Sequence, residues 1–394
     1  MILLSSTRPA SSLWALAVAS FASIASMRAC DAILHDLTLE FAATTAQVAQ
    51  TISGFGIAYG LMQFVFGPLG DRWGKLRIMT LAVLACALCN VAVALSEGLD
   101  ALVWGRVLAG AAGGGIVPLC LAHIGDTVAY ERRQMILSRL MTATLSGMIA
   151  GQWLGGLVAQ YWGWRAVFWC LAALFMGVLP ALWRAAQMQG APATPSGLSE
   201  MPSRIRQLLA RPRARAILLA VTLEGATGFA VFTFVPVLLS QRFGLSSGSA
   251  GAVAAVLGLG GLAYTLSARA IIARLGEGGM VRLGGWGIGV SLVAMGAVGQ
   301  WQWAVPACAL GGLSLYMLHN TLQAQATQMH PQMRGTALAV FASCLFLGTA
   351  LGVTVASWLI DHDLMTAVFV GAGVFLPLLG TLLARELKGS GSTA

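Results

Sequence analysis

The stretch GPLGDRWGKLR, residues 67–77, is a short charged segment between two long apolar runs. It places the acidic residue Asp71 among the basic residues Arg72, Lys75 and Arg77, and its glycines allow the backbone to turn sharply. The apolar runs on both sides reach about 20 residues, the length that an α-helix needs to cross a bilayer. The stretch therefore predicts a tight loop that joins two transmembrane helices at a membrane surface.

The composition of the whole chain also indicates a membrane protein. Hydrophobic residues make up 58% of the 394 residues, and Asp, Glu, Lys and Arg together make up only 9%. Because soluble globular proteins carry about 25% charged residues, this composition excludes a water-soluble enzyme, a disordered protein and a nucleic-acid-binding domain. The apolar runs are continuous rather than alternating, which argues against a β-barrel.

Twelve apolar segments of spanning length recur along the chain. The first is longer than the core of a signal peptide and carries Arg28 and Asp31, so we expect it to remain as a membrane helix. The segments lie at about Leu13–His35, Thr45–Gly67, Ile78–Leu95, Leu99–His123, Met135–Gln160, Trp164–Trp183, Ile217–Gln241, Ser249–Ile272, Met280–Val298, Trp303–Gln325, Ala337–Leu359 and Leu364–Ala384.

The expected fold is all-α, a membrane protein with twelve transmembrane helices in two pseudo-symmetric halves of six. Residues 1–184 are predicted to form the N-terminal half, residues 185–213 a cytoplasmic linker, and residues 214–394 the C-terminal half. The linker ends in a basic amphipathic segment, Arg204–Arg211. We expect this segment to lie on the inner leaflet, where each basic side chain gains about 1 kcal/mol from anionic lipid.

The net charge of +9 is a signal of membrane topology. Among the basic residues, Arg165 and Arg242 fall in loops opposite the chain termini, and Arg28 and Arg106 fall within spans. The remaining Lys and Arg residues lie on the side of the termini. Because cytoplasmic loops carry the excess of Lys and Arg, both termini are predicted to be cytoplasmic, in a bacterial cytoplasmic (inner) membrane.

The two halves also share a spacing of arginine and glycine residues. In each half an arginine stands 14 residues before a GxxxG motif, and the two motifs are Gly147–Gly151 and Gly348–Gly352. The triplet RWG at 72–74 is matched by RLG at 274–276. GxxxG alone commonly reflects close helix packing, but the shared spacing predicts two parallel six-span repeats with a site between them.

These residues resemble the major facilitator superfamily. Its cytoplasmic signature loop between spans 2 and 3 is matched by Gly67, Asp71, Arg72, Gly74, Lys75 and Arg77. The segment Trp104–Gly110, which contains Arg106, resembles the span-4 arginine motif common in proton-coupled members. The resemblance covers essentially the whole chain and implies that the signature loop acts as a latch between two global conformations.

The fifth predicted span resembles the antiporter motif of the same superfamily. The matching glycines are Gly147, Gly151, Gly155 and Gly156. The family motif has Pro where this chain has Gln152, and an upstream Gly where Arg139 stands. The most similar group is the twelve-span drug–proton antiporters and related efflux permeases.

Four charged residues fall within the predicted spans and are functional candidates because charge is costly in a bilayer. Arg28 and Asp31 are neighbours on one helix face, in the outer half of span 1, and Arg106 shares their depth. Since spans 1 and 4 line the cavity in the family, we expect an Arg28–Asp31–Arg106 cluster that gates the outer side or binds an anionic group. A purely structural lock between the two spans is the alternative.

Glu224 lies near mid-membrane in span 7 without a basic residue within a helical turn. His319 lies at a similar depth in span 10, and both spans line the family's cavity, so the two side chains are expected to meet. Because desolvation favours a neutral carboxyl group, we expect Glu224 to carry the coupled proton, with His319 as a relay. Asp31, held ionised by its arginines, is the second candidate for proton coupling.

The remaining cavity candidates are polar and aromatic residues within spans. Singly, each is better explained by helix packing, but together they suggest a pocket for a moderately amphipathic small molecule. They are Gln63, Gln152, Trp153, Phe232, Tyr316, Asn320 and Gln323.

The sequence therefore predicts a secondary transporter that exports a small organic solute, a drug or metabolite, by proton-coupled alternating access. Proton-coupled uptake of a nutrient or metabolite is the first alternative, and a polytopic membrane enzyme is the second. The GxSxG match at 244–248 lacks the strand that a hydrolase requires, so we expect no enzyme. The seven Cys lie in apolar runs, and neither a metal site nor a cofactor is expected. The expected partners are solute, protons and the lipid bilayer, without nucleic acid, for a monomeric protein.

Overall fold

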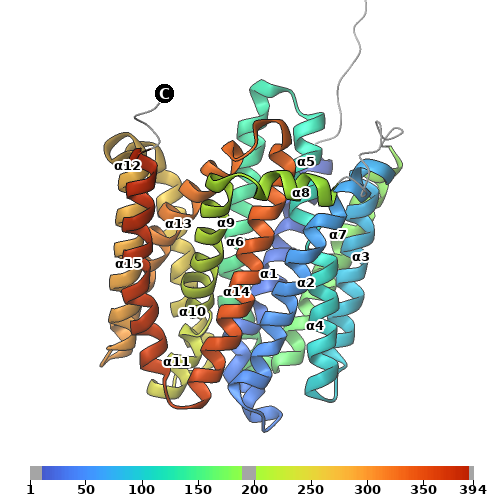
Figure 1. Ribbon diagram of the computed structural model, residues 1–394. Coiled ribbons are helices and arrows are strands. Elements are labelled where there is room, and N and C mark those ends of the chain that lie inside the picture. The colour runs from blue at the N-terminus through green and yellow to red at the C-terminus, as the bar shows by residue number, and fades with distance from the viewer. Residues whose placement is uncertain (1–10, 189–200, 390–394) are drawn as a thin grey trace, which may run out of the picture.

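The computed structural model describes residues 11–188 and 201–389. Residues 1–10, the linker residues 189–200 and residues 390–394 lie outside the described part of the chain. The described residues form helices and contain no strand (Figure 1). In chain order the elements are α1 (Ser11–Glu40), α2 (Thr45–Trp73), α3 (Lys75–Ala94), α4 (Leu99–Gly113), α5 (Ile116–Thr127), α6 (Tyr130–Trp162), α7 (Trp164–Gln187), α8 (Met201–Leu209), α9 (Pro212–Glu224), the π-helix η2 (Gly225–Phe229), α10 (Ala230–Phe232), α11 (Val235–Phe243), α12 (Ser247–Gly296), the 3-10 helix η3 (Trp301–Trp303), α13 (Ala304–Gln328), the 3-10 helix η4 (Pro331–Met333), α14 (Arg334–Asp361) and α15 (Met365–Gly389).

The twelve predicted spans each fall on a helix or an interrupted helix of the described residues, which confirms the all-α membrane fold. Within these residues nine helices are long and apolar enough to cross a membrane. One of them, α12, contains the predicted eighth and ninth spans, which are separated at Gly276 (φ 60°, ψ 176°). The predicted fifth and tenth spans correspond to α6 and α13.

The fourth span is interrupted between α4 and α5 by a close approach to α2. A Cβ on Gly114 would lie 2.5 Å from the carbonyl oxygen of Tyr59, and a Cβ on Gly115 would meet the ring of Phe66. Only glycine allows the two backbones to come this close. These two glycines therefore form the turn between α4 and α5 and also allow α2 to cross at this point.

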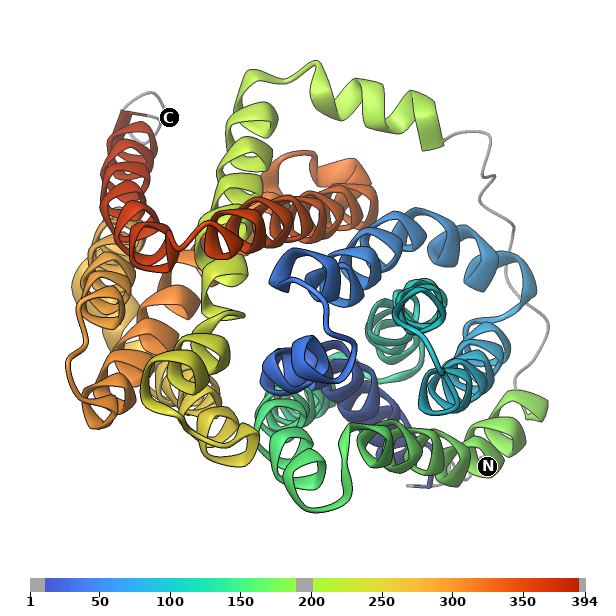
Figure 2. The ribbon, with the colours of Figure 1, turned by 90° about the horizontal axis from the view of Figure 1, so that it is seen from below.

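The helices pack as two groups. In the first group α1 contacts α6 and α7, and α2 and α3 contact α4; in the second, α12 contacts α13 and α15, and α14 contacts α9. Figure 2 shows the blue-to-green group beside the yellow-to-red group, with α8 along the edge of the bundle. The groups meet where α2 packs on α14, α6 on α12, and α1 on α11 and α12.

The repeat seen in the sequence has a counterpart in the packing. Two glycines of α6 lie against carbonyl oxygens of α1, and two glycines of α14 lie against those of α9 and η2. The pairs are Gly147 with Phe21, Gly151 with Ala25, Gly348 with Thr222, and Gly352 with Ala226. Both the glycines and their partners are offset by 201 residues, so the two halves reuse one helix crossing.

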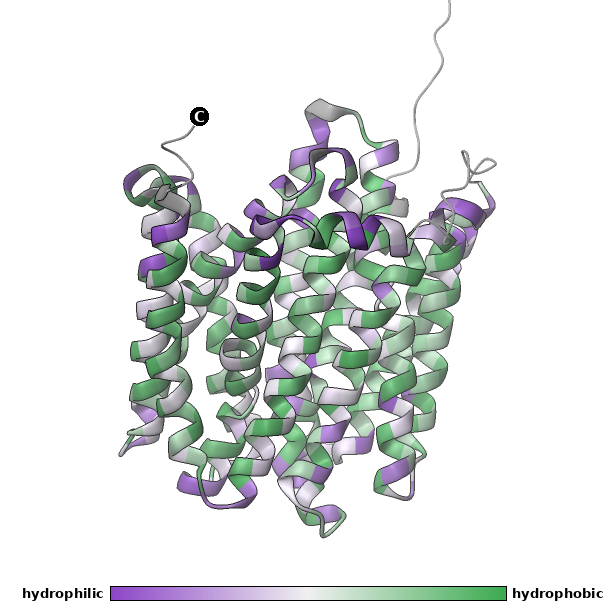
Figure 3. Cartoon of the chain, viewed as in Figure 1, coloured by the Kyte–Doolittle hydropathy of each residue, from purple (hydrophilic) through white to green (hydrophobic). Residues whose placement is uncertain are grey.

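The surface of the bundle is apolar around its middle, and hydrophilic residues gather at its two ends (Figure 3). Large apolar side chains such as Leu266 and Trp303 are 81% and 68% exposed, which is costly in water but favourable in lipid. This distribution is that of an integral, multi-pass membrane protein. We call the end that holds α8 the α8 end, and the opposite end the far end (Figure 1).

Candidate functional site

Arg28 and Asp31 form an ion pair on one face of α1. Nη1 of Arg28 lies 3.2 Å from Oδ2 of Asp31, whose side chain is fully buried. The same nitrogen donates to Oγ1 of Thr233, between α10 and α11, at 3.4 Å. Nε2 of Gln152 in α6 also donates to Oδ2 of Asp31, at 3.4 Å. Residues of both halves therefore hold this pair.

The structure does not bring Arg106 into this ion pair, although the sequence predicted a three-membered cluster. The buried guanidinium donates to the carbonyl oxygens of Thr51 (3.4 Å) and Met27 (3.5 Å) and to Oγ of Ser26 (3.4 Å). It also lies 4.3 Å from the ring centre of Phe55. Carbonyl oxygens and an aromatic face stabilise this cation in place of a carboxylate, so Arg106 joins α4 to α1 and α2.

Glu224 and His319 meet in the second half, as the sequence predicted. Nδ1 of His319 lies 3.1 Å from Oε2 of Glu224. The Glu224 side chain is fully buried, and that of His319 is 13% exposed. The imidazole ring also packs against Phe229 and Phe341, with ring centres 5.4 and 5.6 Å away. A carboxyl group and an imidazole are thus joined next to two aromatic rings.

Glu224 is the last residue of α9, and the π-helix η2 begins directly after it. A Cβ on Gly225 would lie 2.5 Å from the carbonyl oxygen of Leu345, so α14 approaches the helix at this point. Short π-helices occur frequently at functional sites, and discontinuous membrane helices commonly form transport sites. Sequence periodicity missed this π-helix, although Gly225, Gly228 and Pro236 within one span were a signal for an irregular helix.

Three buried side-chain oxygens near these pairs have no hydrogen-bond partner among the described residues: Oδ1 of Asp31, Oε1 of Gln152 and Oε1 of Glu224. The three side chains are at most 2% exposed. All three atoms are acceptors, and an unpaired buried acceptor is costly in a membrane protein. Each is therefore a place where a proton or the donor group of a ligand would be stabilised.

The other cavity candidates have varied surroundings. Tyr316 joins the halves, because its Oη lies 3.7 Å from Sδ of Met148 in α6. Phe232 and Gln63 are buried, Asn320 is half-buried, and Trp153 and Gln323 are exposed.

The predicted signature loop is a network of charges at the α8 end. Nζ of Lys75 lies 3.0 Å from a carboxylate oxygen of Asp71 and 2.6 Å from one of Asp126, at the end of α5. Gly74 ends α2 with φ 96°, a conformation that favours glycine. Sequence reasoning missed Asp126, an acidic residue at the end of the fourth span.

The remaining signature positions lie outside this network. Gly67 has open space around it, Arg72 stacks on the ring of Trp73 at 5.4 Å, and Arg77 is exposed.

The second half has a corresponding network after Gly276. Nε2 of Gln325 donates to Oε2 of Glu277 at 2.7 Å, and Nη2 of Arg213 donates to Oε1 of Gln325 at 2.6 Å. Glu277 stands at the position that corresponds to Lys75 in the repeat. Sequence reasoning matched the glycine but missed this charge-reversed network, because the residue types differ between the halves.

The glycines of the predicted antiporter motif have three kinds of surroundings. Gly147 and Gly151 touch α1 in the same half, whereas a Cβ on Gly155 would meet no atom closer than 3.8 Å among the described residues. Gly156 lies against the backbone of Ser247 in α12, and Oγ of Ser247 donates to the carbonyl oxygen of Gly156 at 3.2 Å. The motif therefore serves packing within one half and contact between the halves.

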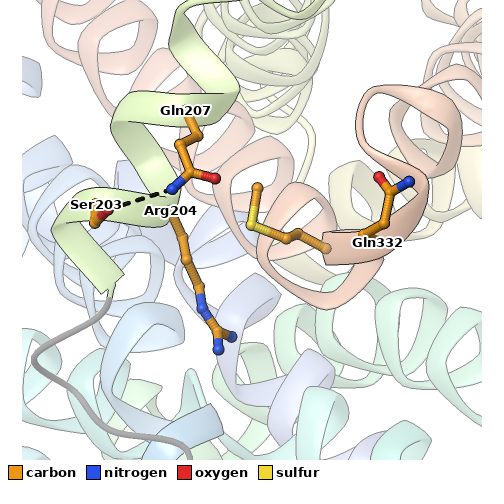
Figure 4. A pocket seen from close by; sticks show the side chains of 5 residues that line it. Ser203, Arg204, Gln207 and Gln332 are labelled. Carbon is orange, nitrogen blue, oxygen red and sulfur yellow. Dashed lines mark hydrogen bonds between the residues drawn. The ribbon is translucent and has the colours of Figure 1, made fainter.

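A polar cavity of about 370 Å³ lies at the α8 end. It is lined by Ser203, Arg204 and Gln207 of α8 and by Gln332 and Met333 of the segment before α14 (Figure 4). Nε2 of Gln207 donates to Oγ of Ser203 at 3.4 Å. This cavity belongs to the linker helix and the surface, and none of the predicted cavity residues lines it.

Comparison with known proteins agrees with this geometry. The family model described as Major Facilitator Superfamily matches residues 16–353. An uncharacterized MFS-type transporter of Bacillus subtilis (strain 168), YceJ, is 24% identical over 357 residues, which cover 89% of this chain and 90% of YceJ.

Two solved structures share the fold. The nucleoside transporter NupG superposes with a TM-score of 0.76 at 14% identity, over 95% of this chain and 99% of NupG. A D-xylose-proton symporter superposes with a TM-score of 0.73 at 15% identity, over 94% of this chain and 96% of the symporter. At these identities the similarity establishes a common fold.

Proposed function

The chain belongs to the major facilitator superfamily, and from that premise we propose that it exports a small organic solute in exchange for protons. Membership of the family makes the chain an integral membrane transporter. The direction of transport and the coupled ion are our proposal. The observation on which it rests is the buried Glu224–His319 pair beside the π-helix η2 of span 7.

Glu224 is the proposed proton carrier. Its carboxyl group is shielded from water, one of its oxygens has no partner, and an imidazole lies 3.1 Å from the other. Burial without a fixed cation favours protonation, while the neighbouring imidazole can take up the proton that the carboxyl group releases. His319 is partly exposed and is therefore the proposed relay between Glu224 and water.

The Arg28–Asp31 pair is proposed to gate the far side of the cavity and to contribute to proton coupling. Arg28 contacts Thr233 across the interface, so the surroundings of the pair must change when the halves separate there. Protonation of Asp31 would weaken its attraction to Arg28 and favour that change. The gate and the carrier would then respond to the same ion.

The proposed orientation places the α8 end in the bacterial cytoplasm, with both termini on that side. The basic loops of the sequence support it. Contacts between the halves include Arg28 with Thr233, Ser247 with Gly156, and Asp361 with the first residues of α2. We propose that these contacts close the protein to the outside, and that a monomer opens there by rocking of one half.

The experiment compares the wild type with Glu224→Gln in liposomes that contain a pH-sensitive dye. Ethidium, uridine and D-xylose are first screened by thermal stabilisation of the purified protein, since a bound solute stabilises the native state. A gradient of the stabilising compound is then imposed. We expect Glu224→Gln to lose at least 90% of the proton flux while it still binds the compound. Glu97→Gln, at an exposed position, is the matched control. Undiminished coupled flux in Glu224→Gln would contradict the carrier role.

Proton-coupled uptake is the second candidate, because Gln152 stands where the antiporter motif has proline. Inside-out vesicles with an acidic interior separate the two functions. An exporter accumulates the labelled compound in these vesicles, whereas an uptake transporter drives it out.

A further inference from the structure

The N-terminus of α2 is capped partly by residues of its own half. Oγ1 of Thr44 accepts from the backbone N–H of Gln47 at 3.2 Å, and Oε1 of Gln47 accepts from the N–H of Thr44 at 2.9 Å. The N–H of Val48 donates to the carbonyl oxygen of Thr44. This capping box leaves two of the first helical N–H groups, those of Thr45 and Ala46, without a partner in the same half.

Asp361 supplies both missing partners from the other half. Its Oδ1 accepts from the N–H of Thr45 and its Oδ2 from the N–H of Ala46, each at 2.8 Å. Asp361 is the last residue of α14, and α14 packs along α2 (Figure 1). A carboxylate is thus placed at the positive end of a helix dipole, with one oxygen for each free N–H group.

We propose that Asp361 is a latch that holds the far side of the transporter closed. The contact joins the first residues of α2, in one half, to the last residue of α14, in the other, so it must break when the far ends of α2 and α14 separate. In the opened state both N–H groups and the carboxylate would bind water instead. The latch rests on the proposed alternation between two states, but not on the solute or the coupled ion.

The other contacts between α2 and α14 differ from the Asp361 contact in charge and in depth. Further along the same helix pair, Oγ of Ser343 donates to the carbonyl oxygen of Gly60 at 2.7 Å, and Gly56 lies against Ala350. These contacts lie deeper in the bundle and involve small, neutral residues. Asp361 is a charged link at the far end, where the separation of the halves would be largest.

The test measures backbone hydrogen exchange in lipid nanodiscs for the wild type, Asp361→Asn and Asp363→Asn. Asn keeps the shape of Asp but loses the charge and one acceptor oxygen. Asp363 lies two residues further on, is exposed, and has φ 62°, which Asn tolerates. It is the matched control.

Exchange at residues 45–46 reports the lost hydrogen bond itself, so the decisive regions are distant from Asp361. We expect Asp361→Asn to raise exchange about five- to tenfold at residues 243–250, at the far end of the other interface, and to lower it at residues 70–77 at the α8 end. Exchange equal to that of Asp363→Asn, or a rise at both ends, would overturn the latch. The exchange assay contains neither a solute nor a proton gradient, whereas the carrier role of Glu224 is tested by proton flux in liposomes, so the failure of one proposal is distinguishable from the failure of the other.

Discussion

Gly151→Ala tests the close contact between α6 and α1. A Cβ at position 151 would lie 2.5 Å from the carbonyl oxygen of Ala25 and 3.0 Å from its Cα. Because Cβ atoms essentially never approach other heavy atoms within 3.0 Å, the two helices must move apart. Restoring an ordinary contact of 3.4 Å at the oxygen requires a displacement of about 0.9 Å.

The expected cost follows from two opposing effects. Overpacking a close contact costs about 1–3 kcal/mol, and replacing glycine by alanine within a helix recovers about 0.5–1 kcal/mol. Gly155→Ala, four residues further along the same helix, has the same backbone gain without the clash, because its nearest contact would be at 3.8 Å. The free energy of unfolding of Gly151→Ala should therefore lie about 1–3 kcal/mol below that of Gly155→Ala.

The measurement is reversible unfolding in mixed micelles with increasing SDS, followed by the fluorescence of the 12 tryptophans. Gly352→Ala is an internal replicate, because its Cβ would meet the carbonyl oxygen of Ala226 in the corresponding crossing of the second half. If Gly151→Ala and Gly155→Ala unfold within about 0.5 kcal/mol of each other, the close crossing is refuted.

Three further predictions concern the buried Arg106, the backbone at Gly276 and the ion pair of Lys75. Arg106→Lys should lower the free energy of unfolding by about 1–3 kcal/mol in the SDS assay, because one ammonium group cannot reach all three oxygens that the buried guanidinium binds. Gly276→Ala should cost about 1–3 kcal/mol by thermal unfolding; its Cβ would enter open space, so the cost comes from the backbone conformation alone. Lys75→Met should cost about 0.5–1 kcal/mol, and a double variant with Asp126→Asn should cost less than the sum of the single variants if the two side chains are paired.

From the sequence, the depth of a residue in the membrane could be predicted better than the direction in which its side chain points around the helix axis. Hydropathy and the rise per residue placed Glu224 and His319 at a similar level, and the structure joins them. The same reasoning placed Arg106 level with Arg28 and Asp31, but the guanidinium binds other groups of α1 and α2. Helix rotation depends on packing over the whole bundle, which a local pattern does not contain.

Contacts between distant segments were also beyond the sequence pattern. Asp361 resembles any polar residue that ends a span, and the N–H group of Ala46, to which it bonds, lies 315 residues away. Asp126 was missed for the same reason, since it stands outside the motif that it completes. Glu277 was missed because the residue types differ between the two halves. The glycine repeat could be seen in the sequence, because a close helix crossing requires small residues four positions apart on the same helix.

The contacts between the halves combine glycine crossings with hydrogen bonds to backbone groups, and the hydrogen bonds bear on transport. Within each half, glycines bring two helix backbones into direct contact, as Gly151 does with Ala25 and Gly352 with Ala226. Separating such helices would open a void along their length, so each half should move as a rigid body. Between the halves, the hydrogen bonds of Ser247 and Ser343 hydroxyls and of the Asp361 carboxylate join backbone groups.

Each of these bonds contributes about 0.5–1.5 kcal/mol net, or up to about 3 kcal/mol where a charge is involved, and those at the far end can be exchanged for bonds to water. A hydrogen bond of this size is comparable with the effect of protonating one buried carboxyl group, since one unit of pKa corresponds to about 1.4 kcal/mol. Glycine crossings also lie between the halves, as where Gly251 meets the carbonyl oxygen of Gln152 and Gly156 that of Ser247, and they add to these hydrogen bonds. Gly156 is the exception within its motif: it packs on Ser247 across the interface, so Gly156→Ala should favour the open state while Gly151→Ala weakens the fold.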